Sequence, residues 1–285
     1  MKRTLALSTI LVFIVCLSLF VSGCVDDSSD DEEDEKTNMA PPDVDKVDDQ
    51  NETMPTEVET GEKAVKVEDA VENETGAYSP VINPADFTDN IDNPYFPLVP
   101  GTTFFYEGES EDETIRTEVF VTSETRVVMG VNTTVVRDRE WEDDELVEET
   151  FDWYAQDKNG NVWYFGEESR DFEDGKLVST EGSWEAGVNG AQPGILIEGK
   201  PKVGDIYRQE YFKDEAEDMA EVLAMNESVS VEYGSFENCL KTREWNPLEP
   251  GSEENKYYAT GIGLLLEIET KGGSEKLELV KITIE

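Results

Sequence analysis

Apolar and polar side chains alternate with a period of two through most of the chain beyond residue 100. In residues 114–122, Ile115, Val119 and Val121 occupy alternate positions, and most of the positions between them carry charged or hydroxyl side chains. A β-strand turns successive side chains to opposite faces, whereas a helix repeats every 3.6 residues. The alternation therefore predicts half-buried β-strands.

The same alternation recurs in short segments that are separated by turn residues. Further strands are expected at residues 102–107, 131–135, 151–156, 162–165, 177–184, 205–212, 229–233, 240–245, 256–259, 264–270 and 277–284. Asp157-Lys158-Asn159-Gly160 predicts a hairpin turn between two of them. Residues 214–225 fit a helical period about as well as a strand period. Together these features predict a mainly β fold, a single antiparallel meander that forms a sandwich or a partly closed barrel.

The N-terminus has the layout of a secretory signal peptide. Lys2 and Arg3 precede an apolar run over residues 5–21, and small residues follow it. A short cationic start before an apolar stretch is typical of such signals, and we assign residues 1–23 to one. The alternative is an uncleaved membrane helix, for which this run has the minimum length. Either outcome places the rest of the chain outside the cytoplasm.

Residues 24–76 predict a disordered acidic tether. From residue 25 the segment holds 20 acidic residues, 4 lysines and no aromatic residue. Low hydrophobicity and like charge cannot offset the conformational entropy that folding would cost. Aromatic residues begin at Tyr78, so residues 77–285 are expected to form the folded domain.

Charge and histidine content exclude several function classes. The chain carries 67 acidic and 23 basic residues, a formal net charge of −44, and it has no histidine. Such a charge repels phosphate backbones, so we expect no nucleic-acid partner. The absence of histidine removes Ser-His-Asp and Cys-His nucleophiles and every zinc site that uses histidine. We expect no cofactor, no metal site and no assignable catalytic residue.

Cysteine usage leaves one thiol in the predicted domain. Cys16 lies in the predicted signal peptide and Cys24 follows it directly, so Cys239 is the only cysteine of residues 77–285. An intrachain disulfide in that domain is therefore excluded. Without histidine and among acidic residues, the pKa of this thiol should rise, and we expect a buried, inert side chain.

Several motifs resemble those of an uncharacterised family of archaeal and bacterial lipoproteins. They are Asp92-Asn93-Pro94-Tyr95-Phe96-Pro97-Leu98 and Tyr257-Tyr258-Ala259-Thr260-Gly261-Ile262-Gly263-Leu264. Val21-Ser22-Gly23-Cys24 likewise resembles the lipobox of prokaryotic lipoproteins. The resemblance implies that Cys24 becomes the lipid-modified first residue of the mature chain and that the C-terminal domain is β-rich. It implies no activity.

Two further sets of residues are candidate sites. Trp153, Trp163, Tyr164 and Trp184 lie on strands that should be adjacent and could line a groove for an apolar or glycan ligand. The alternative is that they form sheet core. Four Asn-x-Ser/Thr sequons are candidate glycosylation sites, at Asn51, Asn73, Asn132 and Asn226.

These observations favour a lipid-anchored envelope lipoprotein on the extracytoplasmic face of the cell membrane, a non-catalytic binding or structural module. The alternative is a carboxylate-dependent extracellular hydrolase, because paired acids suffice for glycoside hydrolysis. Two acidic clusters occur, one of Glu140, Glu142, Asp143 and Asp144 and another of Glu148, Glu149 and Asp152. We interpret both clusters as solvated strand faces, so no catalytic pair is singled out.

Overall fold

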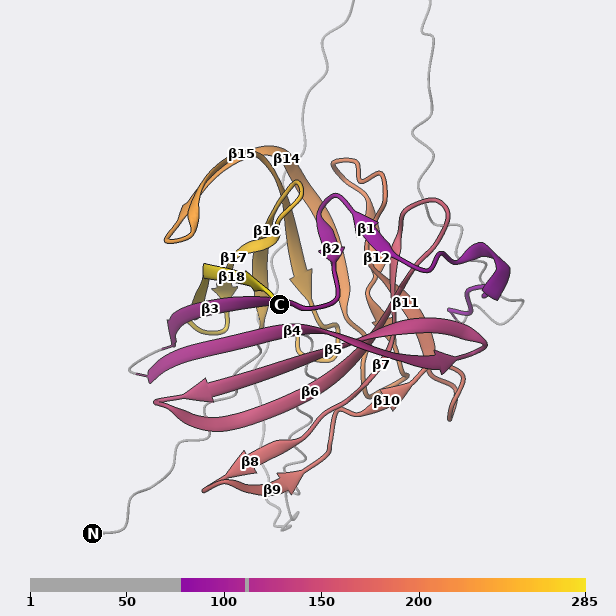
Figure 1. The fold of residues 1–285 in the computed structure, drawn as a ribbon, viewed down its shortest axis with the longest axis horizontal. Coiled ribbons are helices and arrows are strands. Elements are labelled where there is room, and N and C mark those ends of the chain that lie inside the picture. Colours follow the sequence, from indigo (N-terminus) through magenta and orange to yellow (C-terminus); the bar gives the residue numbers. More distant parts are fainter. Residues whose placement is uncertain (1–77, 111–112) are drawn as a thin grey trace, which may run out of the picture. The chain divides into compact units, whose positions relative to one another are not determined.

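Sixteen strands belong to one antiparallel sheet that curves until it is nearly closed into a barrel (Figure 1). The computed structural model describes residues 78–110 and 113–285. The mainly β fold predicted from the sequence is confirmed for this part of the chain. The predicted signal peptide and tether lie outside the described residues.

The elements follow each other along the chain with short connections. They are η1 (Pro84–Asp86), β1 (Ile91–Asn93), β2 (Phe96–Leu98), β3 (Thr102–Ser110), β4 (Glu113–Val128), β5 (Val131–Glu142), β6 (Glu145–Gln156), β7 (Val162–Glu168), β8 (Asp171–Glu173), β9 (Lys176–Ser179), β10 (Trp184–Glu185), β11 (Gln192–Ile197), β12 (Ile206–Arg208), β13 (Glu210–Tyr211), β14 (Met219–Val231), β15 (Gly234–Trp245), β16 (Glu253–Ala259), β17 (Gly263–Lys271) and β18 (Lys276–Ile284). No helix of the described residues is long and apolar enough to cross a membrane.

The strand order explains how the sheet closes. Along the sheet it is β12-β14-β15-β16-β17-β18-β3-β4-β5-β6-β7-β11-β13. The two ends of this path, β12 and β13, are consecutive in the sequence, so one segment pairs with β14 on one side and with β11 on the other. Gln209 lies between them, and its backbone N–H donates to the Asp218 carbonyl at 2.8 Å. Its side-chain amide donates to the Leu196 carbonyl at 3.2 Å.

The sequence prediction and the structure differ in several places, and β1, β2 and β8 are among the strands that were not predicted. Residues 214–225 hold no helix, and β14 begins at Met219, because pairing with β15 supplies the backbone hydrogen bonds. Strand β11 was not predicted, since its Pro193 and Gly194 weaken a strand pattern. The strand predicted over residues 177–184 is interrupted, because β9 ends at Ser179 and β10 begins at Trp184.

The β1–β2 hairpin lies across one end of the curved sheet as a separate two-stranded unit. The side-chain oxygen of Gln156 accepts hydrogen bonds from the backbone N–H groups of Asp92 and Asn93, at 2.9 and 2.7 Å. The Asn93 amide donates to the carbonyls of Gly160 and Glu198. Side-chain hydrogen bonds thus fasten a hairpin that has no ladder to the main sheet.

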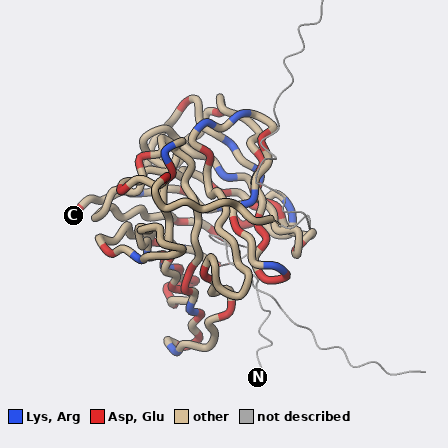
Figure 2. The backbone as a smooth tube through the Cα atoms, turned by 90° about the vertical axis from the view of Figure 1, so that its right-hand side faces the viewer, with Lys and Arg blue, Asp and Glu red and all other residues tan. Residues whose placement is uncertain are grey.

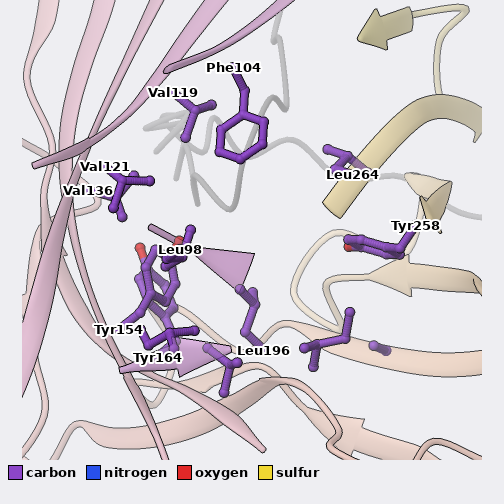
Figure 3. Close-up of a cluster of buried hydrophobic side chains, with 14 of the residues drawn as sticks. Leu98, Phe104, Val119, Val121, Val136, Tyr154, Tyr164, Leu196, Tyr258 and Leu264 are labelled. Carbon is purple, nitrogen blue, oxygen red and sulfur yellow. The ribbon is translucent and has the colours of Figure 1, made fainter. Parts of the chain in front are cut away.

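The inner face of the sheet carries a cluster of buried hydrophobic side chains near this hairpin (Figure 3). Leu98 of the hairpin is buried in this cluster and lies beside Tyr154 in Figure 3. Tyr154 and Tyr164 stack within it, with ring centroids 4.9 Å apart. A second, acidic set of inward side chains lies next to the cluster and is described below.

Stacked cations cover the outer face of the sheet. The Arg126 guanidinium lies 3.8 Å from the centroid of the Trp153 ring, and the Arg243 guanidinium lies 4.6 Å from that of Trp245. Comparable pairs occur along β3, β4, β5 and β6. The long basic side chains cover part of each aromatic ring and reduce its contact with water.

Candidate functional site

A large hollow of the described surface lies on the outer face of β18, β3, β4 and β5. Its volume is about 690 Å³. We call it the acidic groove, and its lining residues are Glu107, Gly108, Glu109, Thr114, Ile115, Arg116, Trp141, Asp144, Glu232, Ser274, Lys276, Glu278 and Val280. Typical small-molecule sites have volumes of about 300–1,000 Å³, so the groove has the size of a ligand site.

Neighbouring strands and one distant hairpin build the acidic groove. Glu107 and Glu109 on β3 pair with Arg116 and Thr114 on β4, and Arg116 pairs with Trp141 on β5. The β14–β15 hairpin supplies a wall, because the Tyr233 N–H donates to the Leu279 carbonyl of β18 at 3.1 Å. Figure 1 shows this hairpin curving past β16, β17 and β18.

Trp141 forms the aromatic part of the acidic groove. Its indole ring is half-buried, and the Arg116 and Arg139 guanidinium groups lie 3.8 and 5.0 Å from the ring centroid. Glu118 accepts hydrogen bonds from both arginines, at 2.8 and 2.7 Å. Two cations and a carboxylate therefore hold the indole in a fixed position.

Carboxylates outnumber cations in the acidic groove. Five lining residues are acidic, whereas Arg116 and Lys276 are the two basic ones. Acidic residues occur throughout the described chain (Figure 2), so the groove shares the sign of its surroundings. Its electrostatic field attracts cations and neutral hydrogen-bond donors and repels anions.

A second unusual feature lies inside the sheet, where acidic side chains are buried. The buried acids of the described chain are Asp138, Glu140, Asp152, Asp157, Glu167, Glu198, Glu210, Asp218, Glu244, Glu254, Glu267 and Glu275. Lys256 is the one basic residue among the buried side chains of residues 78–110 and 113–285. Buried carboxylates without cations favour the protonated, neutral form.

The inward acids next to the hydrophobic cluster have raised pKa values. Asp152 accepts a hydrogen bond from the Tyr164 hydroxyl at 2.8 Å, yet its burial and the charge of Glu148 raise its pKa. Burial and the charges of Asp152 and Glu148 raise the pKa of Asp138. One oxygen of Asp138 has no hydrogen-bond partner.

A small cavity separates these two acids from the β1–β2 hairpin. Pro97 and Leu98 line it from the hairpin side, and Asp138 and Asp152 line it from the sheet. Its volume is about 30 Å³. A water molecule needs about 10–15 Å³ in this measure, so the cavity has room for about two waters and for no sugar ring or acyl chain.

The acidic clusters interpreted as solvated strand faces require a correction. Glu140 and Asp152 point into the sheet and are 5% and 6% exposed, respectively. Asp143 and Asp144 are exposed at the β5–β6 turn, as expected. The error arose because on β5 the outward positions carry arginine and tryptophan, so polarity did not indicate which face is buried.

The structure separates the four aromatic residues that were predicted to line a groove. Tyr164 and Trp184 are buried and lie edge to face, with ring centroids 5.3 Å apart. Trp153 lies on the opposite face under Arg126. Trp163 is half-buried and donates to the Asp157 carboxylate at 3.0 Å. Ligand binding by these four residues stays a prediction.

The remaining predicted sites are placed as follows. Cys24, Asn51 and Asn73 lie outside the described residues. Asn132 and Asn226 are exposed on β5 and β14, and their modification stays a prediction. Cys239 is a buried free cysteine, as expected, and burial raises the pKa of its thiol; its inertness stays a prediction.

Sequence reasoning missed Trp141 and Lys256, the central residues of the two features. Each is a single residue in a strand where apolar and polar side chains alternate in the usual way, and its role depends on neighbours on the adjacent strands. The available signal was nearby acids, because Trp141 lies between Glu140 and Glu142, and Glu254 precedes Lys256 by two residues. The described residues hold no group of three or more cysteine or acidic side chains placed to bind a metal ion.

No protein-family model and no curated protein matches the chain. Solved structures do. A candidate exported protein of Bacteroides fragilis with a YmcC-like fold has 14% sequence identity and a TM-score of 0.41, over 66% of this chain and 98% of that one. A candidate lipoprotein of Parabacteroides distasonis has 13% identity and a TM-score of 0.37, over 69% of this chain and all of that one, 100%.

Proposed function

We propose that this protein is a lipid-anchored, outward-facing envelope lipoprotein that binds a glycan in the acidic groove and catalyses no reaction. The observation that carries the binding role is the groove of about 690 Å³ with Trp141 in its lining. Nine of the thirteen lining residues have hydroxyl, carboxylate or cationic side chains. Such a lining suits a ligand rich in hydroxyl groups.

Cavity size favours a polar ligand over an apolar one. An acyl chain would need an enclosed apolar space, and the cavity beside Leu98 measures about 30 Å³. The acidic groove is more than twenty times larger in the same measure and is mostly polar. The glycan is therefore the preferred alternative of the two ligand classes considered from the sequence.

The hydrolase alternative has weaker support. Asp138 and Asp152 are inward carboxyl groups with raised pKa values, as a general acid requires. The adjoining cavity cannot admit a sugar ring, so a substrate bond has no access to them. Buried acids with perturbed pKa values also occur as purely structural groups.

The anchoring part of the proposal rests on the apolar run of residues 5–21 and on Cys24. A protein that loses its only long apolar segment needs lipid chains to remain at the membrane. We expect native protein to sediment with membranes and a Cys24→Ser variant to lose its lipid mass. Unmodified native protein with residues 1–23 still attached would contradict lipid anchoring.

The binding part is tested with the full chain in detergent against a glycan array, followed by calorimetry with each hit. Trp141→Ala should weaken binding at least tenfold, because an aromatic contact is lost from the groove. Trp245→Ala is the matched control, since Trp245 is a half-buried tryptophan that also stacks under an arginine. Equal loss in both variants, or no glycan bound, would contradict the proposal.

A further inference from the structure

We propose that the acidic groove selects glycans that carry protonated amino groups, as hexosamine units with free amines do. This inference rests on the proposed function and names the ligand class of the same site. It depends on three observations, which are the placement of the carboxylates, the neutralisation of the two cations and the fixed position of Trp141.

The carboxylates of the acidic groove lie on several sides of it. Glu107 and Glu109 come from β3, and Glu278 comes from β18. Glu232 follows β14 directly, and Asp144 lies in the β5–β6 turn. A ligand lying across β18, β3 and β4 would therefore meet carboxylates from three or more chain segments. Carboxylates accept hydrogen bonds from hydroxyl groups and form stronger, charge-assisted ones with ammonium groups.

Carboxylates already pair with the two cations of the acidic groove. Arg116 donates to Glu118 at 2.8 Å, and Lys276 donates to Glu278. Neither cation is therefore available as an isolated positive charge for a phosphate, sulfate or uronate group. The remaining carboxylates, Glu107, Glu109 and Asp144 among them, give the site a net negative field that favours ammonium groups.

Trp141 adds a recognition element that tolerates cations. The Arg116 guanidinium at 3.8 Å already exploits the negative face of the indole. A sugar ring can contact the exposed part of the indole through its C–H face while its amine reaches a carboxylate. An anionic sugar would gain the same ring contact and would meet like charge around it. The difference between these ligands is therefore electrostatic.

The net charge of the chain acts in the same direction. Residues 77–285 carry 47 acidic and 17 basic residues. A body of that charge raises the local concentration of cationic ligands and lowers that of anionic ones at low ionic strength. The preference should therefore diminish with added salt, because exposed charges are screened beyond a Debye length of about 10 Å at 0.1 M.

The experiment compares four oligomers of equal length by calorimetry on the full chain in detergent, at a pH where sugar amines are protonated. They are glucosamine tetramer, N-acetylglucosamine tetramer, galacturonate tetramer and tetralysine. We expect the glucosamine tetramer to bind at least tenfold more tightly than its acetylated counterpart and the galacturonate tetramer not to bind. Added salt should reduce the first affinity and leave the second unchanged.

Variants test whether the acidic groove is responsible. Glu107→Gln and Glu109→Gln should each weaken binding of the glucosamine tetramer about two- to fivefold, the range for an exposed ion pair. Glu173→Gln is the control, because Glu173 is exposed on β8 and does not line the groove. None of these three changes should alter binding of the acetylated tetramer.

The outcomes separate this inference from the proposed function. Equal affinity for both glucosamine forms, lost in Trp141→Ala, overturns the amine preference and leaves glycan binding intact. If the galacturonate tetramer binds most tightly, the amine preference is likewise overturned and glycan binding remains. If tetralysine binds and none of the sugar tetramers does, both the amine preference and the glycan-binding function are overturned, and the groove is a site for basic peptides. Binding of no oligomer overturns both as well.

Discussion

The ammonium group of Lys256 lies 2.9 Å from the Glu254 carboxylate inside the curved sheet. Glu244 and Glu267 lie 3.4 and 3.6 Å from the same nitrogen. Burial alone would lower the pKa of Lys256, but the three carboxylates raise it well above its usual value. One cation on β16 thus joins acids from β15, β16 and β17 and compensates the charge of this part of the interior.

Replacement of Lys256 by methionine should destabilise the fold strongly. Removing one partner of a buried ion pair leaves uncompensated charge and costs about 3–5 kcal/mol. Urea denaturation followed by tryptophan fluorescence measures the change. The control is Lys281→Met, because Lys281 is exposed and stacks on Phe105. A free energy of unfolding equal in the two variants would show that Lys256 does not compensate the acids.

Stability should fall as pH rises from about 5 to about 8. Burial and the charges of Glu254 and Glu269 raise the pKa of Glu275 to about 8, and burial raises the pKa of Glu140 and Glu210 well above their usual values. A raised pKa means that the folded state holds protons that the unfolded state has released. Each such group contributes stability that is complete below the unfolded-state pKa and is lost as pH rises through the folded-state pKa.

Denaturation midpoints measured over this pH range check the direction. Each additional proton bound by the folded state changes the slope by about 1.4 kcal/mol per pH unit. Glu275→Gln should reduce the slope, since the amide does not titrate. Glu173→Gln, at an exposed position, should leave it unchanged. If the unsubstituted protein becomes more stable from pH 5 to 8, the folded state does not raise the pKa values of these buried acids.

Gly194→Ala should separate β11 from the segment that joins β12 and β13 and so open the curved sheet at this point. A Cβ at residue 194 would lie 2.3 Å from the backbone carbon and oxygen of Gln209 and 2.6 Å from the nitrogen of Glu210. Those atoms belong to the segment that joins β12 and β13, so β11 must move away from it. Overpacking of this kind costs about 1–3 kcal/mol. Gly251→Ala is the control, because no atom lies within 4 Å of its added Cβ.

Thermal unfolding and hydrogen exchange distinguish local from global effects of Gly194→Ala. We expect faster exchange in residues 206–211 as well as a lower melting temperature. Unchanged exchange in that segment would mean that the sheet is not closed there.

Gln156→Leu should release the β1–β2 hairpin. The change leaves the N–H groups of Asp92 and Asn93 without their acceptor, and an unsatisfied buried group such as the Asn93 N–H costs about 1–3 kcal/mol. Hydrogen exchange of residues 88–98 should accelerate more than that of β4 and β5. Gln192→Leu is the control, because the Gln192 amide bonds only locally, to the Gly190 carbonyl at 3.4 Å. Uniform acceleration over all strands would instead indicate global destabilisation.

Local pattern was sufficient to predict the fold class and several strands. The Asp157-Lys158-Asn159-Gly160 turn illustrates this, because the Asp157 side chain accepts hydrogen bonds from the backbone N–H groups of Asn159 and Asn161, as a turn requires. Strand β3 was likewise predicted from its first residue, Thr102. These features depend on neighbours within a few residues, and the sequence alone therefore determines them.

Which face of each strand lies inside depends on contacts between strands that are distant in the sequence. On β5, Asp138 and Glu140 face inward, whereas Arg139 and Trp141 face outward. A period of two indicates two faces, and burial is then decided by closure of the sheet and by the partners that each face meets. Lys256 compensates some inward acids, burial raises the pKa of others, and arginines stack on the outward rings. Such partners come from strands far apart in sequence, so no local pattern could predict the acidic groove or the acidic interior.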